Sequence, residues 1–114
     1  MTKRIETPRG DRNRILHLRI RVADAEQPRL LEFLREALPF YEAPGGIRIR
    51  LLRSCDDPSR LIEAVEYRDR EVHDRDQVRV ETDPQMRSFL DRWRALLQGP
   101  PEVETYEEIT DWSQ

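Results

Sequence analysis

The sequence predicts an α+β domain in which four strands and two main helices alternate. Three observations indicate this class. Apolar residues alternate with polar ones, or cluster with other strand-forming residues, at 15–22, 47–53, 60–67 and 103–109. Apolar stripes with helical spacing separate these segments, and Pro, Gly and Asp gather at the connections. The length of 114 residues suits a single domain.

Composition narrows the classes of function. Hydrophobic residues make up 37% of the chain and charged residues 38%, so a dimer that hides extra surface would help so small a domain. The net charge of −3 is a poor match for nucleic acid. No apolar run approaches the roughly 18 residues of a membrane span, and the N-terminus lacks the apolar core of a secretory signal. We expect a cytoplasmic protein that binds neither nucleic acid nor membrane.

Residues 1–13 are expected to form a flexible tail before one domain at 14–114, because Pro8 and Gly10 interrupt regular structure. The first fourteen residues are basic and include Lys3, Arg4, Arg9, Arg12 and Arg14. Such a segment either contacts an acidic partner or is simply solvated.

The first strand and helix follow from alternation and then helical spacing. The strand is expected to present Leu16, Leu18, Ile20 and Val22 on one face and His17, Arg19 and Arg21 on the other. Asp24 and Gln27 then resemble a capping box, and Pro28 suits a first helical turn. An apolar stripe runs from Leu30 to Leu38, and Pro39 is expected to end the helix.

The segments 47–53 and 60–67 read as two strands of a hairpin, joined by the polar turn 54–59. The turn contains Cys55, the only cysteine, so an internal disulfide is excluded. Residues 68–80 are expected to form a short exposed helix, and Val78–Val80 could instead be briefly extended.

The second main helix has the clearest signals. Thr82 or Asp83 caps it, and Pro84 suits its first position. Its stripe consists of Met86, Phe89, Leu90, Trp93 and Leu97. Gly99 is expected to stop this helix before the last strand, 103–109.

This order predicts a ferredoxin-like βαββαβ fold, an antiparallel four-stranded sheet with its helices on one face. The opposite face would carry His17, Arg19, Arg21, Arg48 and Arg50. Acids are available in Glu63 or Glu66 and in Glu104 or Glu108, and each cross-strand ion pair would contribute at most about 1 kcal/mol. We predict that this face pairs with a second copy of the chain; the alternative is a plain solvated face.

One stretch resembles a known family. It runs from Arg50 through Asp57-Pro58 and continues from Leu61 to Tyr67, followed by the acidic step Asp69-Arg70-Glu71. Together with Gly99-Pro100-Pro101 before a final strand containing Tyr106, it resembles the dimeric α+β barrel superfamily, in particular its antibiotic biosynthesis monooxygenase-like domains. The resemblance implies a homodimer with face-to-face sheets and a pocket between sheet and helices. Some members oxidise polycyclic aromatic compounds with oxygen and no metal or flavin, and others degrade haem.

The residues do not match the haem-degrading pattern. Those members use an Asn on the first strand, a Trp ending the third and a His on the last helix. Here Asn13 precedes the strand, Tyr67 holds the Trp-like position and the last helix has no histidine. Only Tyr67 carries over, from the oxygenases in which an aromatic at this position faces the pocket.

We predict a ligand pocket formed by Tyr67, His17, Trp93 and Phe89. His17 could carry a proton near neutral pH, but interface or core packing also explains each of these residues. No cofactor is expected, and the two histidines, His17 and His73, lack metal-ligand spacing. Three functions remain open: a cofactor-free monooxygenase acting on an aromatic or quinone-like molecule, a non-catalytic dimeric binding or sensor module, and an interaction protein that uses the basic tail.

Overall fold

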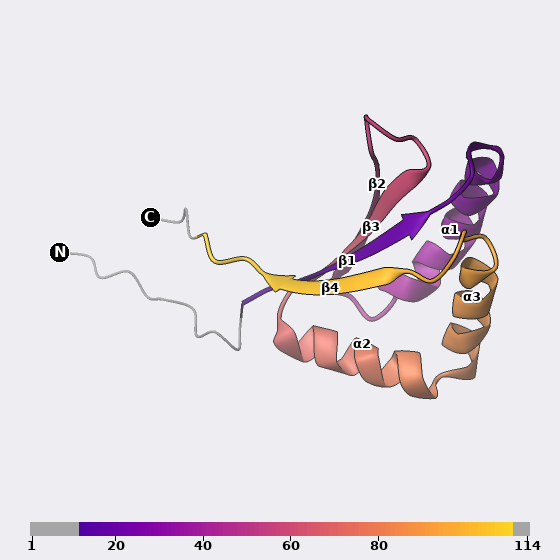
Figure 1. Ribbon diagram of the computed structural model, residues 1–114. Coiled ribbons are helices and arrows are strands. Elements are labelled where there is room, and N and C mark those ends of the chain that lie inside the picture. Colours follow the sequence, from indigo (N-terminus) through magenta and orange to yellow (C-terminus); the bar gives the residue numbers. More distant parts are fainter. Residues whose placement is uncertain (1–11, 111–114) are drawn as a thin grey trace.

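The structure, a computed structural model, describes residues 12–110 (Figure 1). The first half contains β1 (Arg14–Arg21), a short 3-10 turn η2 (Asp24–Glu26), α1 (Gln27–Glu42) and β2 (Ile47–Arg53). The second half contains β3 (Arg60–Tyr67), α2 (Arg70–Thr82), α3 (Pro84–Arg94) and β4 (Glu102–Glu107).

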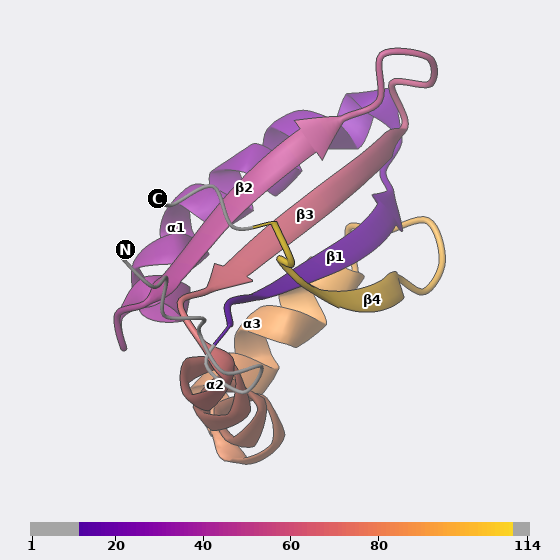
Figure 2. The same ribbon diagram turned by 90° about the vertical axis from the view of Figure 1, so that its left-hand side faces the viewer.

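The four strands form one sheet in the order β2-β3-β1-β4. Every neighbouring pair is antiparallel, with β1 in the centre between β3 and β4. Figure 2 shows one face of the sheet open toward the viewer, with α1 behind it. The predicted ferredoxin-like α+β architecture is therefore confirmed, with α2 as an additional helix before α3.

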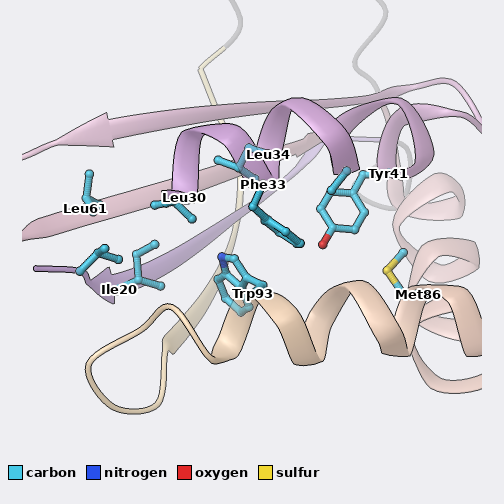
Figure 3. Close-up of a cluster of buried hydrophobic side chains, with 10 residues drawn as sticks. Ile20, Leu30, Phe33, Leu34, Tyr41, Leu61, Met86 and Trp93 are labelled. Atoms are coloured by element: carbon cyan, nitrogen blue, oxygen red, sulfur yellow. The ribbon is translucent and has the colours of Figure 1, made fainter. Parts of the chain in front are cut away.

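The core fills the space between the sheet and the helices. Its main cluster joins β1 and β3 to α1 and α3, and Figure 3 shows eight of its residues labelled: Ile20, Leu30, Phe33, Leu34, Tyr41, Leu61, Met86 and Trp93. A smaller cluster joins Ile47, Val65, Tyr67 and Val72 under the start of α2. Alternation on each strand places these apolar side chains on the helix side of the sheet.

The prediction that Pro39 ends the first helix is wrong, since α1 continues through Pro39 to Glu42. Two contacts explain the extra turn. Tyr41 is buried in the core, and the Arg79 guanidinium donates to the carbonyl oxygens of Phe40 at 2.9 Å and Tyr41 at 2.7 Å. These bonds satisfy carbonyls that have no partner at a helix end, which outweighs the one backbone bond that proline removes.

The predicted capping box at Asp24 is also wrong. Residues Asp24–Glu26 form a 3-10 turn, and α1 begins without a side-chain cap. The Gln27 side chain is buried instead and donates to the carbonyl oxygens of Val22 at 3.2 Å and Pro58 at 2.7 Å. Gln27 therefore joins the end of β1 to the β2–β3 turn.

The segment predicted as a short exposed helix is a full helix of 13 residues that packs on the sheet edge. Asp69 caps it by accepting a hydrogen bond from the backbone N–H of Val72 at 2.9 Å. Val72 and Asp76 are buried, and the alternative of an extended Val78–Val80 is excluded because these residues are helical.

The chain ends differ from the predicted boundaries in detail. The third helix stops at Arg94, so Leu97 of the predicted stripe lies beyond it. Asn13, assigned to the tail, is fixed beside the last strand, since the Glu108 backbone N–H donates to its Oδ1 at 3.1 Å. The rest of the predicted tail, residues 1–11, lies outside the described residues.

Candidate functional site

A pocket of about 210 Å³ lies between the helix side of the sheet and the helices α2 and α3. Alternation on β3 places Glu63, Val65 and Tyr67 on its floor. Most of the remaining wall is apolar and comes from four elements: Leu16, Leu18, Ile47, Ile49, Val80, Met86, Leu90 and Trp93. This mixture of an apolar wall and a few polar groups is typical of small-molecule sites.

Glu63 is the unusual residue of this pocket. It pairs across the sheet with Leu18 on one side and Leu51 on the other, so its strand neighbours are apolar. Glu63 is only 4% exposed, and its Oε1 has no hydrogen-bond partner among the described residues. Burial raises the pKa of Glu63 to about 7, and the nearby Trp93 indole opposes this rise without forming a hydrogen bond of normal geometry.

Trp93 supplies the second unpaired polar group. It extends from α3 toward α1 and the sheet (Figure 3), it is 4% exposed, and its Nε1 has no partner among residues 12–110. A buried polar atom without a partner costs about 1–3 kcal/mol. The pocket therefore holds one acceptor and one donor that a bound molecule could satisfy.

Tyr67 lines the pocket but its hydroxyl is already engaged. The hydroxyl donates to Asp76 Oδ2 at 2.6 Å, and Arg79 pairs with the other oxygen of Asp76 at 3.1 Å. Burial raises the pKa of Tyr67, and the Asp76 carboxylate raises it further. This network places Tyr67 as a fixed wall of the pocket and leaves it poorly suited to lose its proton.

Of the four residues predicted for the pocket, the structure brings only Tyr67 and Trp93 together there. Phe89 packs instead in the neighbouring aromatic cluster, with ring centroids 6.1 Å from Phe33 and 5.9 Å from Tyr41. The assignment of His17 to the pocket is corrected, because His17 follows Leu16 on β1 and so points to the opposite face. There its ring lies 5.2 Å from Tyr106.

Glu63 was missed as a pocket residue because it was grouped with Glu66 as an acid for the arginine face. The signal was present in the sequence. Leu61, Val65 and Tyr67 are two or four residues from position 63, so a strict period of two puts Glu63 on their face.

The predicted arginine face is the side of the sheet that no helix covers (Figure 2). We call it the open face and define it by His17, Arg19, Arg21, Arg48, Arg50, Leu52, Ile62, Ala64, Glu66, Glu104 and Tyr106. Three ion pairs involve its arginines: Arg19 with Glu104 at 2.8 Å, Arg50 with Glu66 at 2.6 Å and Arg21 with Asp57 at 3.1 Å. The paired side chains are exposed to solvent, so water screens the pairs and they contribute little to stability.

The other titratable candidates lie outside the pocket. The His73 ring, on α2, packs edge-on against Tyr67 with ring centroids 4.9 Å apart, and Cys55 is exposed in its turn. Within residues 12–110, no three His, Cys, Asp or Glu side chains are grouped to hold a metal ion. None of the helices in the same range has the length and apolar character needed to cross a bilayer.

Comparison with known proteins identifies the fold. No protein-family profile and no curated protein matches the sequence, whereas solved structures do. A proposed antibiotic biosynthesis monooxygenase from Bordetella bronchiseptica matches with a TM-score of 0.72 and 16% identity, over 87% of this chain and 99% of that one. SnoaB, a cofactor-independent oxygenase from Streptomyces nogalater, matches with a TM-score of 0.70 and 16% identity, over 90% and 98%. A NIPSNAP family protein from Agrobacterium tumefaciens matches with a TM-score of 0.68 and 17% identity, over 98% and 97%.

The chain thus has the fold of these solved structures, which confirms the fold implied by the resemblance in residues 50–71 and 99–106. At such identities the likeness concerns the fold, because one fold hosts many activities. What this chain does must therefore be argued from its own pocket.

Proposed function

We propose that this protein is a cofactor-independent monooxygenase that oxidises a small aromatic or quinol-like molecule in the pocket bounded by Glu63, Tyr67 and Trp93. The observation that carries the proposal is this pocket, since it combines an apolar wall with two buried polar atoms that have no hydrogen-bond partner within residues 12–110. The fold shared with SnoaB, itself a cofactor-independent oxygenase, supports the same class of reaction.

The proposed reaction is balanced without any bound group. A quinol and dioxygen give a hydroxylated quinone and water: one oxygen atom is added to the ring, and the other leaves with two hydrogens. The quinol itself supplies the electrons. The protein would bind the ring, exclude bulk water and manage the protons.

Oxygen consumption with a panel of hydroquinones, including naphthohydroquinone, tests this function. We expect the wild-type protein to exceed the uncatalysed rate. Val65→Phe should remove this excess, because Val65 lies on the pocket floor and a phenyl ring would occupy the free volume. A wild-type rate equal to the uncatalysed rate, for every compound of the panel, would reject the oxygenase.

The alternative is a dimeric module that binds a small molecule without reacting. The engaged hydroxyl of Tyr67 favours it, because this group is not free to react. Stabilisation of the protein by aromatic ligands in thermal-shift measurements, without oxygen consumption, would select this alternative.

We also propose that two copies pair through the open face. The cross-strand ion pairs Arg19–Glu104 and Arg50–Glu66 border apolar residues there, among them Leu52 and Tyr106, which are 45% and 44% exposed. A second sheet laid on this face would cover the apolar residues while the ion pairs fix the register.

A further inference from the structure

Two buried polar atoms belong to neighbouring residues that line the same pocket. Glu63 Oε1 comes from β3 and Trp93 Nε1 from α3, and neither has a hydrogen-bond partner among the described residues. We propose that Glu63 and Trp93 form a recognition pair for the hydroxyl group of a phenol or enol, with Glu63 accepting the hydroxyl proton and Trp93 donating to the hydroxyl oxygen. This inference rests on the proposed function, because it names the chemistry that the pocket would select.

The pair fits one functional group particularly well. An indole N–H only donates and a carboxylate only accepts. A hydroxyl group attached to a ring does both from a single oxygen atom, so it satisfies Glu63 and Trp93 at the same time. An ether or a carbonyl could serve only the donor, and a bare hydrocarbon would leave both atoms unpaired.

Three other polar residues of the pocket, Tyr67, Asp76 and Arg79, are already engaged with one another. The hydroxyl of Tyr67 donates to Asp76, and Asp76 is paired with Arg79. Arg79 in turn holds the end of α1 through two carbonyl oxygens. Glu63 is therefore the carboxyl group of this pocket that remains available to a bound molecule.

The proton transfer conserves charge within the site. The O–H bond of the ligand breaks, the proton joins Glu63 Oε1, and the negative charge moves to the ligand oxygen beside the Trp93 N–H. Burial has already raised the pKa of Glu63 to about 7, which brings it closer to the value near 10 of a simple phenol. A smaller difference between the two values makes the transfer easier.

The groups around Glu63 come from every packed element. Tyr41 extends from α1, Asp76 and Arg79 lie on α2, and Arg94 lies on α3. Because Asp76 pairs with Arg79 and Arg94 pairs with Asp91 at 3.7 Å, these charges largely compensate one another. Glu63 is left as the carboxyl that responds to the ligand.

The free volume limits the size of the ligand. An apolar cavity of about 150 Å³ is sufficient to bind benzene, and this pocket measures about 210 Å³. A ring compound somewhat larger than benzene fits, so we expect phenols and enols of one or two rings.

The test compares para-cresol with toluene, which has the same ring but no hydroxyl group, using NMR titration at pH 6 and pH 8. The indole N–H signal of Trp93, assigned through Trp93→Phe, reports on the site. At pH 8 wild type should bind para-cresol roughly 10-fold more tightly than Glu63→Gln does. The two proteins should bind toluene equally, which shows that the variant keeps the pocket intact.

The affinity of wild type for para-cresol should also fall from pH 8 to pH 6 as Glu63 becomes protonated, and in Glu63→Gln it should stay constant. Trp93→Phe keeps an aromatic ring and removes the N–H donor. This variant should therefore lose affinity for para-cresol and keep its affinity for toluene. Glu32→Gln, on the exposed side of α1, is the matched control and should behave as wild type.

Equal binding of para-cresol by wild type and Glu63→Gln would overturn the recognition pair, as would a wild type that prefers toluene or binds neither compound. The outcomes separate this inference from the oxygenase. If hydroquinones are oxidised equally by wild type and Glu63→Gln, the oxygenase stands and the pair fails. If para-cresol binds as expected and no hydroquinone is oxidised, the pair stands and the oxygenase fails.

Discussion

At the scale of single residues, the buried carboxyl of Glu63 couples the stability of the fold to pH. Its pKa is raised by burial from the ordinary 4.5 to about 7 in the folded protein. The folded state therefore binds this proton more tightly than the unfolded state does. The resulting stability is complete below pH 4.5 and is lost as the pH rises through about 7.

Glu63→Gln should remove this dependence, because an amide does not ionise. We expect the variant to gain up to about 3 kcal/mol over wild type at pH 8, and little at pH 5. Urea unfolding of both proteins at the two pH values measures the difference. The exposed carboxyls Glu36, Asp57, Asp69 and Glu104 have lowered pKa values, but they are common to both proteins and cancel. An equal stability difference at both pH values would contradict an ionisable Glu63.

Tyr67 offers a second prediction, because its hydroxyl is a structural group. Tyr67→Phe removes the bond to Asp76 Oδ2 and leaves that buried oxygen without its donor. We expect a loss of about 1–3 kcal/mol in the free energy of unfolding, measured by urea denaturation.

The comparison variant is Tyr106→Phe, which removes the same group from a 44% exposed position of β4, where the hydroxyl meets the solvent-screened pair Arg19 and Glu104. It should alter stability by less than about 0.5 kcal/mol. If Tyr67→Phe were as stable as wild type, the hydroxyl of Tyr67 would not be held by Asp76 in solution.

At the scale of elements, Arg79 connects α2 to the C-terminal end of α1. It pairs with Asp76, donates to the carbonyl oxygens of Phe40 and Tyr41, and stacks over the Phe40 ring at 4.8 Å. Arg79→Met keeps an apolar side chain of similar length but leaves the buried Asp76 without its charge partner. We expect a destabilisation of about 3–5 kcal/mol.

Hydrogen exchange gives the local readout for this variant. The amides of residues 38–43 should exchange faster in Arg79→Met, because the last turn of α1 loses the contact that holds it beyond Pro39. Arg75→Met, at an exposed position of the same helix where the pair is with Glu71, should leave these amides protected. Unchanged exchange at 38–43 in Arg79→Met would show that the end of α1 is held by packing alone.

The sequence was sufficient for elements whose signals are local. Period-two alternation predicted β1 and β2 within a residue or two, and the stripe after Pro84 predicted α3. The sequence was insufficient where a residue far along the chain determines where a helix ends or how it packs. Pro39 reads as a helix end until Arg79, 40 positions later, supplies donors for the carbonyls beyond it. The mixed charge of 70–82 is compatible with the helix predicted there, but it gives little sign of the helix's packing, because only Val72 and Asp76 are buried.

The pocket was predicted in part for a similar reason. The family resemblance points to Tyr67, and the apolar stripe of the helix after Pro84 includes Trp93, so the sequence predicts both of these pocket residues. Phe89 lies one turn before Trp93 on the same face of α3, but its ring packs with Phe33 and Tyr41 and does not line the pocket. Glu63 was overlooked because a carboxylate between apolar neighbours conflicts with ordinary burial preferences, and such conflicts mark functional sites.

At the scale of the whole molecule, the sheet has two faces of different chemistry. The helix side holds the pocket, while the open face bears arginines, glutamates and a smaller number of apolar residues. β1 contributes side chains to both faces: Leu16 and Leu18 line the pocket, and His17 and Arg19 lie on the open face. A substitution on the open face can therefore change assembly without entering the pocket.

The dimer proposed on this face gives the last prediction. Ile62 lies on β3 between Arg19 on one side and Leu52 on the other, so its side chain would be covered by a second sheet. Ile62→Asp places a charge there that a partner sheet would have to desolvate, a cost of several kcal/mol.

We expect wild type to sediment at twice the 13.7 kDa mass of one chain at micromolar concentration, and Ile62→Asp to sediment as a monomer. Leu31→Asp, at a 52% exposed position of α1, is the matched control and should remain dimeric. A wild type that is monomeric at this concentration would reject the dimer, and a dimeric Ile62→Asp would move the interface to another face.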